Sequence, residues 1–198
     1  MSLAVFILPE EPFTSELLLW KNKIKKDFPK QPYANHPPHL TLINLECTDE
    51  SEAIKKLSSF SKKLSSIKVV VNSRNVFLND AFTGGDTIYF GLKQNNSLMK
   101  LQVLIADALA KIKKDTNSSN NFKNDILLYK SNKKYGFPYV GEHWIPHFTV
   151  ASLTTNRRKK ILKDFLSLPT FFDFKINRFS IWRVNQDVHI KLKTIKII

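Results

Sequence analysis

The chain has 198 residues, of which 42% are hydrophobic, and this is enough to form one domain with a shared core. Its 31 Lys and Arg residues against 17 Asp and Glu residues give a formal net charge of +14, which favours polyanionic partners. No apolar stretch comes near the ~18 residues that a membrane-spanning helix needs, which excludes such a helix from the expected elements.

The first part of the chain alternates between strand-like and helix-like patterns. Short apolar runs indicate strands, and apolar residues at helical spacing, such as Ile54, Leu57, Phe60 and Leu64, indicate helices. The expected elements are, in order, a strand at 3–8, a helix at 14–28, a strand at 38–45, a helix at 51–64 and a strand at 67–78.

The remainder of the chain repeats this order. After a turn marked by Gly84 and Gly85, the expected elements are a strand at 87–92, a helix at 97–113, a strand at 146–153, a helix at 156–166 and strand-like runs at 171–184 and 188–195. The sequence therefore predicts two related halves. A pseudo-twofold arrangement of such halves would bring the two corresponding strands, 38–45 and 146–153, to opposite sides of one groove.

These two strands carry nearly the same residues. Residues 38–45 read PHLTLINL and residues 146–153 read PHFTVASL. Because a strand points successive side chains to opposite faces, His39 and Thr41 share one face, and His147 and Thr149 share one face in the second copy. One His-x-Thr triplet is weak evidence, and both segments could be ordinary half-buried strands. The shared flanks and the repeated surroundings favour a functional pair.

Two imidazoles and two hydroxyls suit acid–base chemistry on a phosphate. An ordinary histidine pKa near 6.5 allows one imidazole to be neutral and another protonated around neutral pH. The hydroxyls of Thr41 and Thr149 can donate to non-bridging phosphate oxygens. The near-symmetric pair does not indicate which of His39 and His147 is the acid and which the base.

The paired motifs, His39-Leu40-Thr41-Leu42 and His147-Phe148-Thr149-Val150, resemble those of the 2H phosphoesterase superfamily. The resemblance covers essentially the whole chain, residues 1–198, as one bilobal domain. It implies an α+β fold with pseudo-twofold symmetry, in which two antiparallel sheets form a central groove and helices lie outside. It also implies that His39, Thr41, His147 and Thr149 are catalytic, and that the substrates are 2′,3′-cyclic phosphates or 2′-5′ linkages.

A metal site is the competing interpretation of the histidines. His36 lies three residues before His39, and His143 lies four before His147. Histidines at such spacing usually rely on a helix to align them, and Pro38 and Pro146 disfavour a helix at both places. We therefore interpret His36 and His143 as loop residues and expect no metal and no cofactor.

Four further residues are candidates for substrate binding: Tyr33, Phe77, Trp144 and Arg183. The aromatic rings could stack on an unpaired base, with core packing as the alternative, and Arg183 could contact phosphate unless it is an ordinary surface charge. Residues 113–134 have no counterpart in the first half and are rich in Lys, Asn and Ser, so we expect a mobile surface loop, with a substrate lid as the alternative.

The sequence thus predicts a metal-independent phosphoesterase that hydrolyses 2′,3′-cyclic phosphate or 2′-5′ phosphodiester linkages in RNA, oligonucleotides or cyclic nucleotides. The alternatives are 2′-5′ RNA ligation, which reverses the cleavage, and a non-catalytic RNA-binding module. The sole cysteine, Cys47, can form no internal disulfide, and residues 3–8 lack the basic leader of a signal peptide. We expect a cytoplasmic monomer that does not bind membranes.

Overall fold

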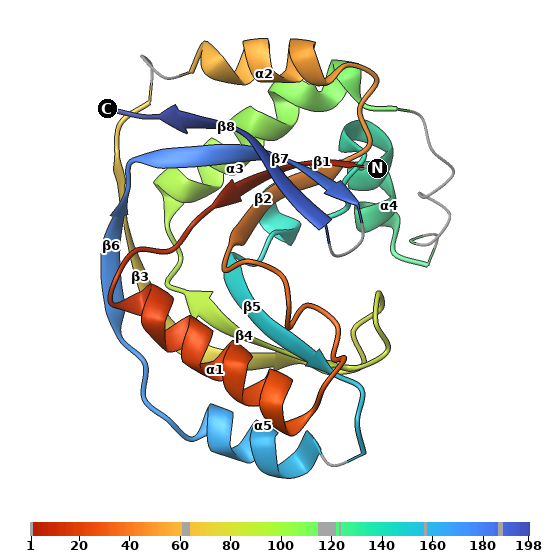
Figure 1. Cartoon of the computed structure of the whole chain (residues 1–198). Coiled ribbons are helices and arrows are strands. Elements are labelled where there is room, and N and C mark those ends of the chain that lie inside the picture. The colour runs from red at the N-terminus through yellow and green to blue at the C-terminus, as the bar shows by residue number, and fades with distance from the viewer. Residues whose placement is uncertain (1, 61–63, 115–121, 123, 157, 186–187) are drawn as a thin grey trace.

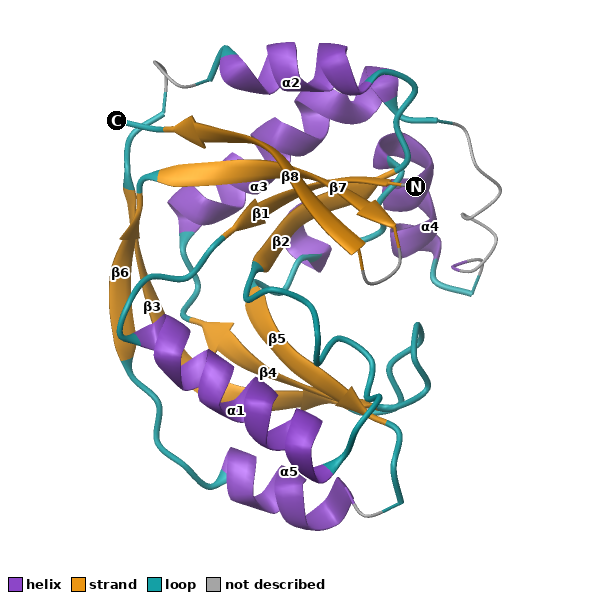
Figure 2. Cartoon of the chain, viewed as in Figure 1, coloured by secondary structure: helices purple, strands orange, loops and turns teal. Residues whose placement is uncertain are grey.

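The computed structural model of the chain describes residues 2–60, 64–114, 122, 124–156, 158–185 and 188–198. Its elements follow the expected order (Figures 1 and 2). The strands are β1 (Ser2–Ile7), β2 (Leu40–Leu45), β3 (Ile67–Phe77), β4 (Asp86–Leu92), β5 (His147–Leu153), β6 (Phe172–Ile176), β7 (Arg178–Asn185) and β8 (Val188–Lys196). The helices are α1 (Phe13–Asp27), α2 (Glu50–Ser58), α3 (Asn96–Leu109), α4 (Ile126–Tyr135) and α5 (Arg158–Leu166), with short 3₁₀ turns η1 (Ala110–Ile112) and η3 (Gly141–His143).

The strands form an antiparallel arrangement of two matching halves. Their order is β6-β3-β4-β5-β2-β1-β7-β8, and β2 meets β5 through the single residue pair Leu40 and Phe148. The α+β class with a pseudo-twofold arrangement is therefore confirmed. The two expected antiparallel sheets are two four-stranded halves of one curved sheet, because this pair joins them.

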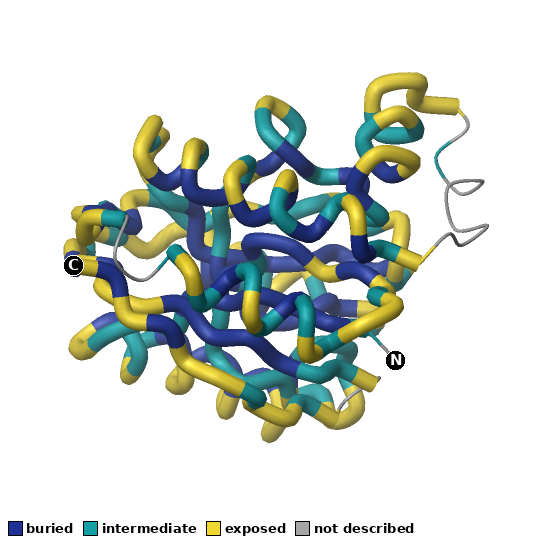
Figure 3. Tube along the Cα trace, turned by 90° about the horizontal axis from the view of Figure 1, so that it is seen from above, coloured by how far each residue is buried: buried dark blue, intermediate teal, exposed yellow. Residues whose placement is uncertain are grey.

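Each half of the sequence contributes strands to the other half of the sheet. β3 follows the first motif strand but pairs with β4, while β7 follows the second motif strand but pairs with β1. The helices cross over too, since α1 packs on β5 and α3 packs on β2. The buried core lies between these helices and the sheet, as the dark blue segments indicate (Figure 3).

Local capping explains where three helices begin. The side chains of Asp49, Asn95 and Asp125 accept backbone N–H groups in the first turns of α2, α3 and α4. Gly136 ends α4 in the left-handed conformation, with a φ of 70°. We expected a loop over 113–134, but residues 126–134 belong to helix α4, so the expectation is wrong for them. Residues 115–121 and 123 of this segment lie outside the described part.

Two further boundaries differ from those expected. The run at 171–184 is two strands, β6 and β7, with Asn177 between them, since β6 pairs with β3 and β7 pairs with β1. The helix expected over 51–64 ends at Ser58, and the helix expected over 97–113 ends at Leu109 and continues as η1. In the described part of the chain, none of the helices is both apolar and long enough to cross a bilayer.

Candidate active site

A groove of about 590 Å³ lies where the two motif strands meet, and both motifs line it. His39, Thr41, His147 and Thr149 all face it, so the expected convergence of the two halves is observed. All five histidines of the chain are among its lining residues, including His36 and His143. The remaining one, His189 on β8, was not recognised from the sequence because it belongs to no repeated motif.

The two motif histidines are held in the same way. Nδ1 of His39 lies 2.7 Å from the carbonyl oxygen of Pro37, and Nδ1 of His147 lies 2.6 Å from the carbonyl oxygen of Ile145. A carbonyl only accepts hydrogen bonds, so Nδ1 carries the hydrogen in both rings. Nε2 is then the nitrogen available to a substrate in the groove. In each copy the accepting residue directly precedes a proline.

Aromatic rings support both imidazoles. The ring of Phe6 stacks on His39 with centroids 3.9 Å apart. Tyr89 lies 5.0 Å from His147, and Phe77 meets the edge of His147 at 5.2 Å while stacking on Tyr89. Phe6 and Tyr89 occupy corresponding places, because each pairs with the threonine of the adjacent motif strand. These contacts fix the planes of the two imidazoles.

Each motif strand contains a bulge just beyond its threonine. In β2, Thr41 and Ile43 pair with consecutive residues of β1, which leaves Leu42 as an extra residue. In β5, Thr149 and Ala151 pair with consecutive residues of β4, which leaves Val150 as an extra residue. A bulge bends a strand and re-aims the side chains beside it, and here it adjoins both threonines.

The charges on the two sides of the groove differ. Burial is the main reason that the pKa of His39 is lowered to about 3; the nearby Lys21, His189 and His36 contribute to this shift, and the hydrogen bond to Pro37 opposes it. Burial also lowers the pKa of His147, but Asp80 opposes this shift by favouring the protonated imidazole. The two histidines therefore share a geometry but experience opposite electrostatic surroundings.

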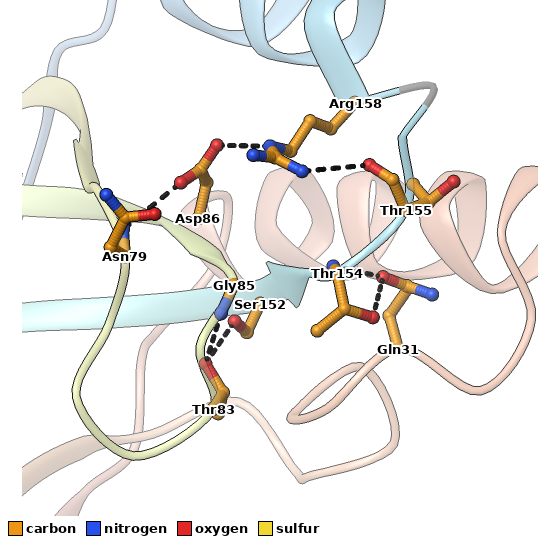
Figure 4. A network of polar contacts seen from close by, with 9 residues as sticks. All are labelled: Gln31, Asn79, Thr83, Gly85, Asp86, Ser152, Thr154, Thr155 and Arg158. Atoms are coloured by element: carbon orange, nitrogen blue, oxygen red, sulfur yellow. Dashed lines mark hydrogen bonds and ion pairs between the residues drawn. The ribbon is translucent and has the colours of Figure 1, made fainter.

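Asp80 is held by the turn between β3 and β4, where Gly84 and Gly85 lie as expected. Its carboxylate accepts the Thr87 hydroxyl at 2.6 Å and the Phe82 N–H at 2.9 Å. A surrounding network fixes this turn to the end of β5 (Figure 4). Its contacts include a hydrogen bond between the hydroxyls of Thr83 and Ser152 at 2.6 Å and an ion pair between Arg158 and Asp86.

Three of the four candidate substrate-binding residues line the groove, namely Tyr33, Phe77 and Trp144. Trp144 is only 5% exposed, which favours core packing over base stacking. Arg183 does not line the groove. Its neighbours Trp182 and Val184 point to one face of β7 and Arg183 points to the other, where its guanidinium makes a bidentate ion pair with Glu50 of α2. The structure therefore does not bring Arg183 to the groove, because its side chain is paired with Glu50 of α2.

Sequence reasoning missed several other lining residues. They include Phe6, Lys21, Asp80, Tyr139 and His189. No motif marks them, since each reaches the groove through contacts between segments that are distant in the sequence. In the residues that the structure describes, no three His, Cys, Asp or Glu side chains are grouped so that they could hold a metal ion.

Comparison with known proteins places these features in a family context. The family model described as the 2′-5′ RNA ligase superfamily matches residues 13–188. The structure of TT0787 from Thermus thermophilus is similar with a TM-score of 0.68 at 14% identity, over 100% of this chain and 98% of that one. E. coli LigT complexed with 3′-AMP has a TM-score of 0.57 at 16% identity, over 98% and 96% of the two chains. No curated protein matches the chain in sequence.

Proposed function

Because the chain belongs to the 2′-5′ RNA ligase superfamily, whose members are phosphoesterases of the 2H type, we propose that it hydrolyses 2′,3′-cyclic phosphates or 2′-5′ phosphodiesters in RNA or oligonucleotides. The observation that carries this proposal is the matched pair of imidazoles. His39 and His147 each direct Nδ1 to a backbone carbonyl and leave Nε2 for the same groove. This arrangement provides two proton-transfer groups on opposite sides of one phosphate.

The reaction on a 2′,3′-cyclic phosphate proceeds by in-line attack of water. One imidazole removes a proton from the water as its oxygen bonds to phosphorus. The bond from phosphorus to one ribose oxygen breaks, and the other imidazole protonates that oxygen. Thr41 and Thr149 donate hydrogen bonds to the non-bridging oxygens, where negative charge accumulates. The two imidazoles perform both proton transfers, so the mechanism requires no metal.

Cleavage of a 2′-5′ linkage uses the same groups with a different nucleophile. The neighbouring ribose 3′-hydroxyl attacks phosphorus, the bond to the 5′-oxygen breaks, and a 2′,3′-cyclic phosphate forms. The reverse of this step is ligation, which is the alternative activity of the same site.

The surroundings of the two histidines suggest their roles. His39 lies near Lys21, whose charge disfavours its protonation, so His39 is the base. His147 experiences the charge of Asp80, which favours the imidazolium, so His147 is the acid. A bound phosphate raises the pKa of both rings by its negative charge and brings the acid into its protonated form.

The test is an activity panel with a chelator present throughout. Purified protein is incubated with 2′,3′-cyclic nucleotides, 2′-5′ oligonucleotides and 3′-5′ controls. We expect chelator-resistant cleavage of cyclic or 2′-5′ substrates that is lost in His39→Ala and in His147→Ala, with thermal unfolding used to verify that each variant folds. Near-full activity in either folded single variant would contradict the two-histidine mechanism. Absence of turnover on the whole panel would favour a binding module, and chelator-sensitive turnover would favour a metal enzyme.

A further inference from the structure

A buried polar side chain lies behind each motif strand, and the two make matching contacts. Lys21 comes from α1, and Nζ donates to the carbonyl oxygens of Val150 at 2.9 Å and Tyr33 at 2.7 Å. Gln102 comes from α3, and Nε2 donates to the carbonyl oxygens of Leu42 at 3.0 Å and Tyr139 at 3.0 Å. Each side chain therefore ties a motif strand to a tyrosine carbonyl in a loop.

The matching extends to the kind of carbonyl that each side chain contacts. Val150 and Leu42 are the extra residues of the two bulges, so neither has an opposite partner in the register with β4 or β1. Tyr33 and Tyr139 lie in the loops that lead to β2 and β5. Each helix thus links two segments: the bulge in the motif strand of the other half and the loop of its own half. At Gln102, a neutral amide is sufficient to make this link.

The two positions differ in charge and in access to the groove. Gln102 is fully buried, uses Oε1 to accept the N–H of Gly141 at 3.0 Å, and is not a lining residue of the groove. Lys21 is only 2% exposed yet lines the groove together with His39 and Thr149. Its ammonium has three donors, and the described residues provide the two carbonyl acceptors given above.

Burying a cation is costly, and this cost lowers the pKa of the buried group. Burial, with a smaller contribution from the charge of Lys25 one turn along α1, lowers the pKa of Lys21 to about 7. Because an amide forms the corresponding link on the other side, holding the bulge does not explain why this position carries a charge. An anion in the groove that Lys21 lines would give this charge a role.

We propose that Lys21 is a substrate-binding cation of the groove, whose ammonium attracts the phosphate held between the two histidine motifs. This inference rests on the proposed function, because it assumes that a phosphoester occupies the groove. A charge in this low-dielectric position acts strongly on a nearby anion, and its two carbonyl contacts hold it in place before the substrate arrives. Lys21 therefore combines binding of phosphate with positioning of β5.

Two variants separate the charge from the structural link. Lys21→Gln reproduces the residue found at the corresponding position and keeps amide donors, whereas Lys21→Met removes both charge and donors. Lys26→Gln, on the exposed side of α1, is the matched control for loss of one positive charge. Binding of inorganic phosphate is measured by calorimetry at pH 6.5, together with thermal unfolding of each protein.

We expect Lys21→Gln to fold and to bind phosphate about 10- to 100-fold more weakly, the range typical of a lost charge-assisted hydrogen bond. Lys26→Gln should bind as the wild type does, and Lys21→Met should lose both affinity and thermal stability. Wild-type affinity in folded Lys21→Gln, or no phosphate binding by the wild-type protein, would overturn the proposal. Phosphate binding is measured without turnover, so failure on the substrate panel would count against the proposed function alone.

A second measurement uses only the wild-type protein and so does not depend on the folding of a variant. Lysine side chains labelled with ¹³C report protonation by NMR, and Lys21 is distinguished by a pKa far below the ordinary lysine value of 10.5. Saturating phosphate should raise the midpoint of this one titration, because a nearby anion favours the ammonium. An unchanged midpoint under saturating phosphate would show that Lys21 does not interact with the bound anion.

Discussion

Trp144 donates its indole N–H to the backbone carbonyl of Thr41 over 3.0 Å. The donor lies in the loop just before one motif and the acceptor lies in the other motif strand. This bond therefore joins the two motif segments near the place where β2 and β5 meet through one residue pair. Trp144 is best described as a residue that positions Thr41, in keeping with its burial.

Replacing Trp144 by Phe tests this positioning. The change keeps an aromatic ring but leaves the Thr41 carbonyl without its donor, which should destabilise the fold by about 1–3 kcal/mol. Turnover should fall because the Thr41 hydroxyl becomes less well placed, with a larger effect on kcat than on KM. Denaturant unfolding and steady-state kinetics measure the two effects. Unchanged kcat in a destabilised Trp144→Phe protein would limit the residue to a structural role.

The threonine hydroxyls give a second prediction. Thr41→Val and Thr149→Val keep the shape of each side chain but remove one donor to the phosphate oxygens. Loss of one such donor typically reduces kcat by about 100-fold or more. Both hydroxyls line the groove, so unfolding should change little. A variant whose kcat stays within about twofold of the wild type would show that its hydroxyl does not stabilise the developing charge.

Much of this site follows from local sequence patterns. The repeated His-x-Thr motif predicted two strands with His39 and His147 on the groove face, because alternation along a strand depends only on nearby residues. The two bulges were not predicted, although each leaves a trace in two consecutive apolar residues, Leu42-Ile43 and Val150-Ala151. At such a position the alternation of side chains does not indicate which residue is the extra one, since the register of the strand depends on its pairing with the neighbouring strand.

Other features depend on contacts between distant segments. Arg183 was a candidate for contact with phosphate, but the face on which it lies is decided by the register of β7 against β1 and by its ion pair with Glu50 of α2. Lys21 was not recognised because its helix carries many lysines, and sequence alone does not distinguish the buried one. Its acceptors on Tyr33 and Val150 are backbone atoms, which leave no signature in residue identity.

The charge of Asp80 predicts an asymmetric pH dependence of catalysis. With His147 as the acid, the alkaline limb of the kcat/KM profile reports the pKa of His147. Asp80→Asn removes a negative charge that raises this pKa, so the alkaline limb should move to lower pH. The amide oxygen still accepts from the Phe82 N–H, which preserves the turn. Movement of the acidic limb in place of the alkaline one would reverse the roles assigned to His39 and His147.

Lys21 also predicts how stability depends on pH. Its pKa is about 7 in the folded protein and near 10.5 in the unfolded chain, so between these values the unfolded state binds more protons. Stability should therefore increase with pH from about 7 to about 9, and be lost as pH falls toward 7. Above about pH 10 the raised pKa of Tyr33 has the opposite effect. Denaturant unfolding should show the increase in the wild type and not in Lys21→Met.

Gln102 provides a test of the matching link on the other side of the sheet. Gln102→Leu preserves the size of the side chain but leaves the carbonyls of Leu42 and Tyr139 and the N–H of Gly141 without partners. Each unsatisfied buried group costs about 1–3 kcal/mol, so the loss of stability should exceed about 3 kcal/mol.

Gln31→Leu is the control for Gln102→Leu, because Gln31 also accepts hydrogen bonds from another segment, through Thr154, but does so at the surface (Figure 4). Water replaces those contacts, so the cost should stay below about 1 kcal/mol. Denaturant unfolding compares the two variants directly. Equal losses would mean that the Leu42 bulge does not depend on Gln102. A large loss confined to Gln102→Leu would establish that the amide stabilises the bulged strand, which is the structural role that Lys21 shares on the opposite side of the groove.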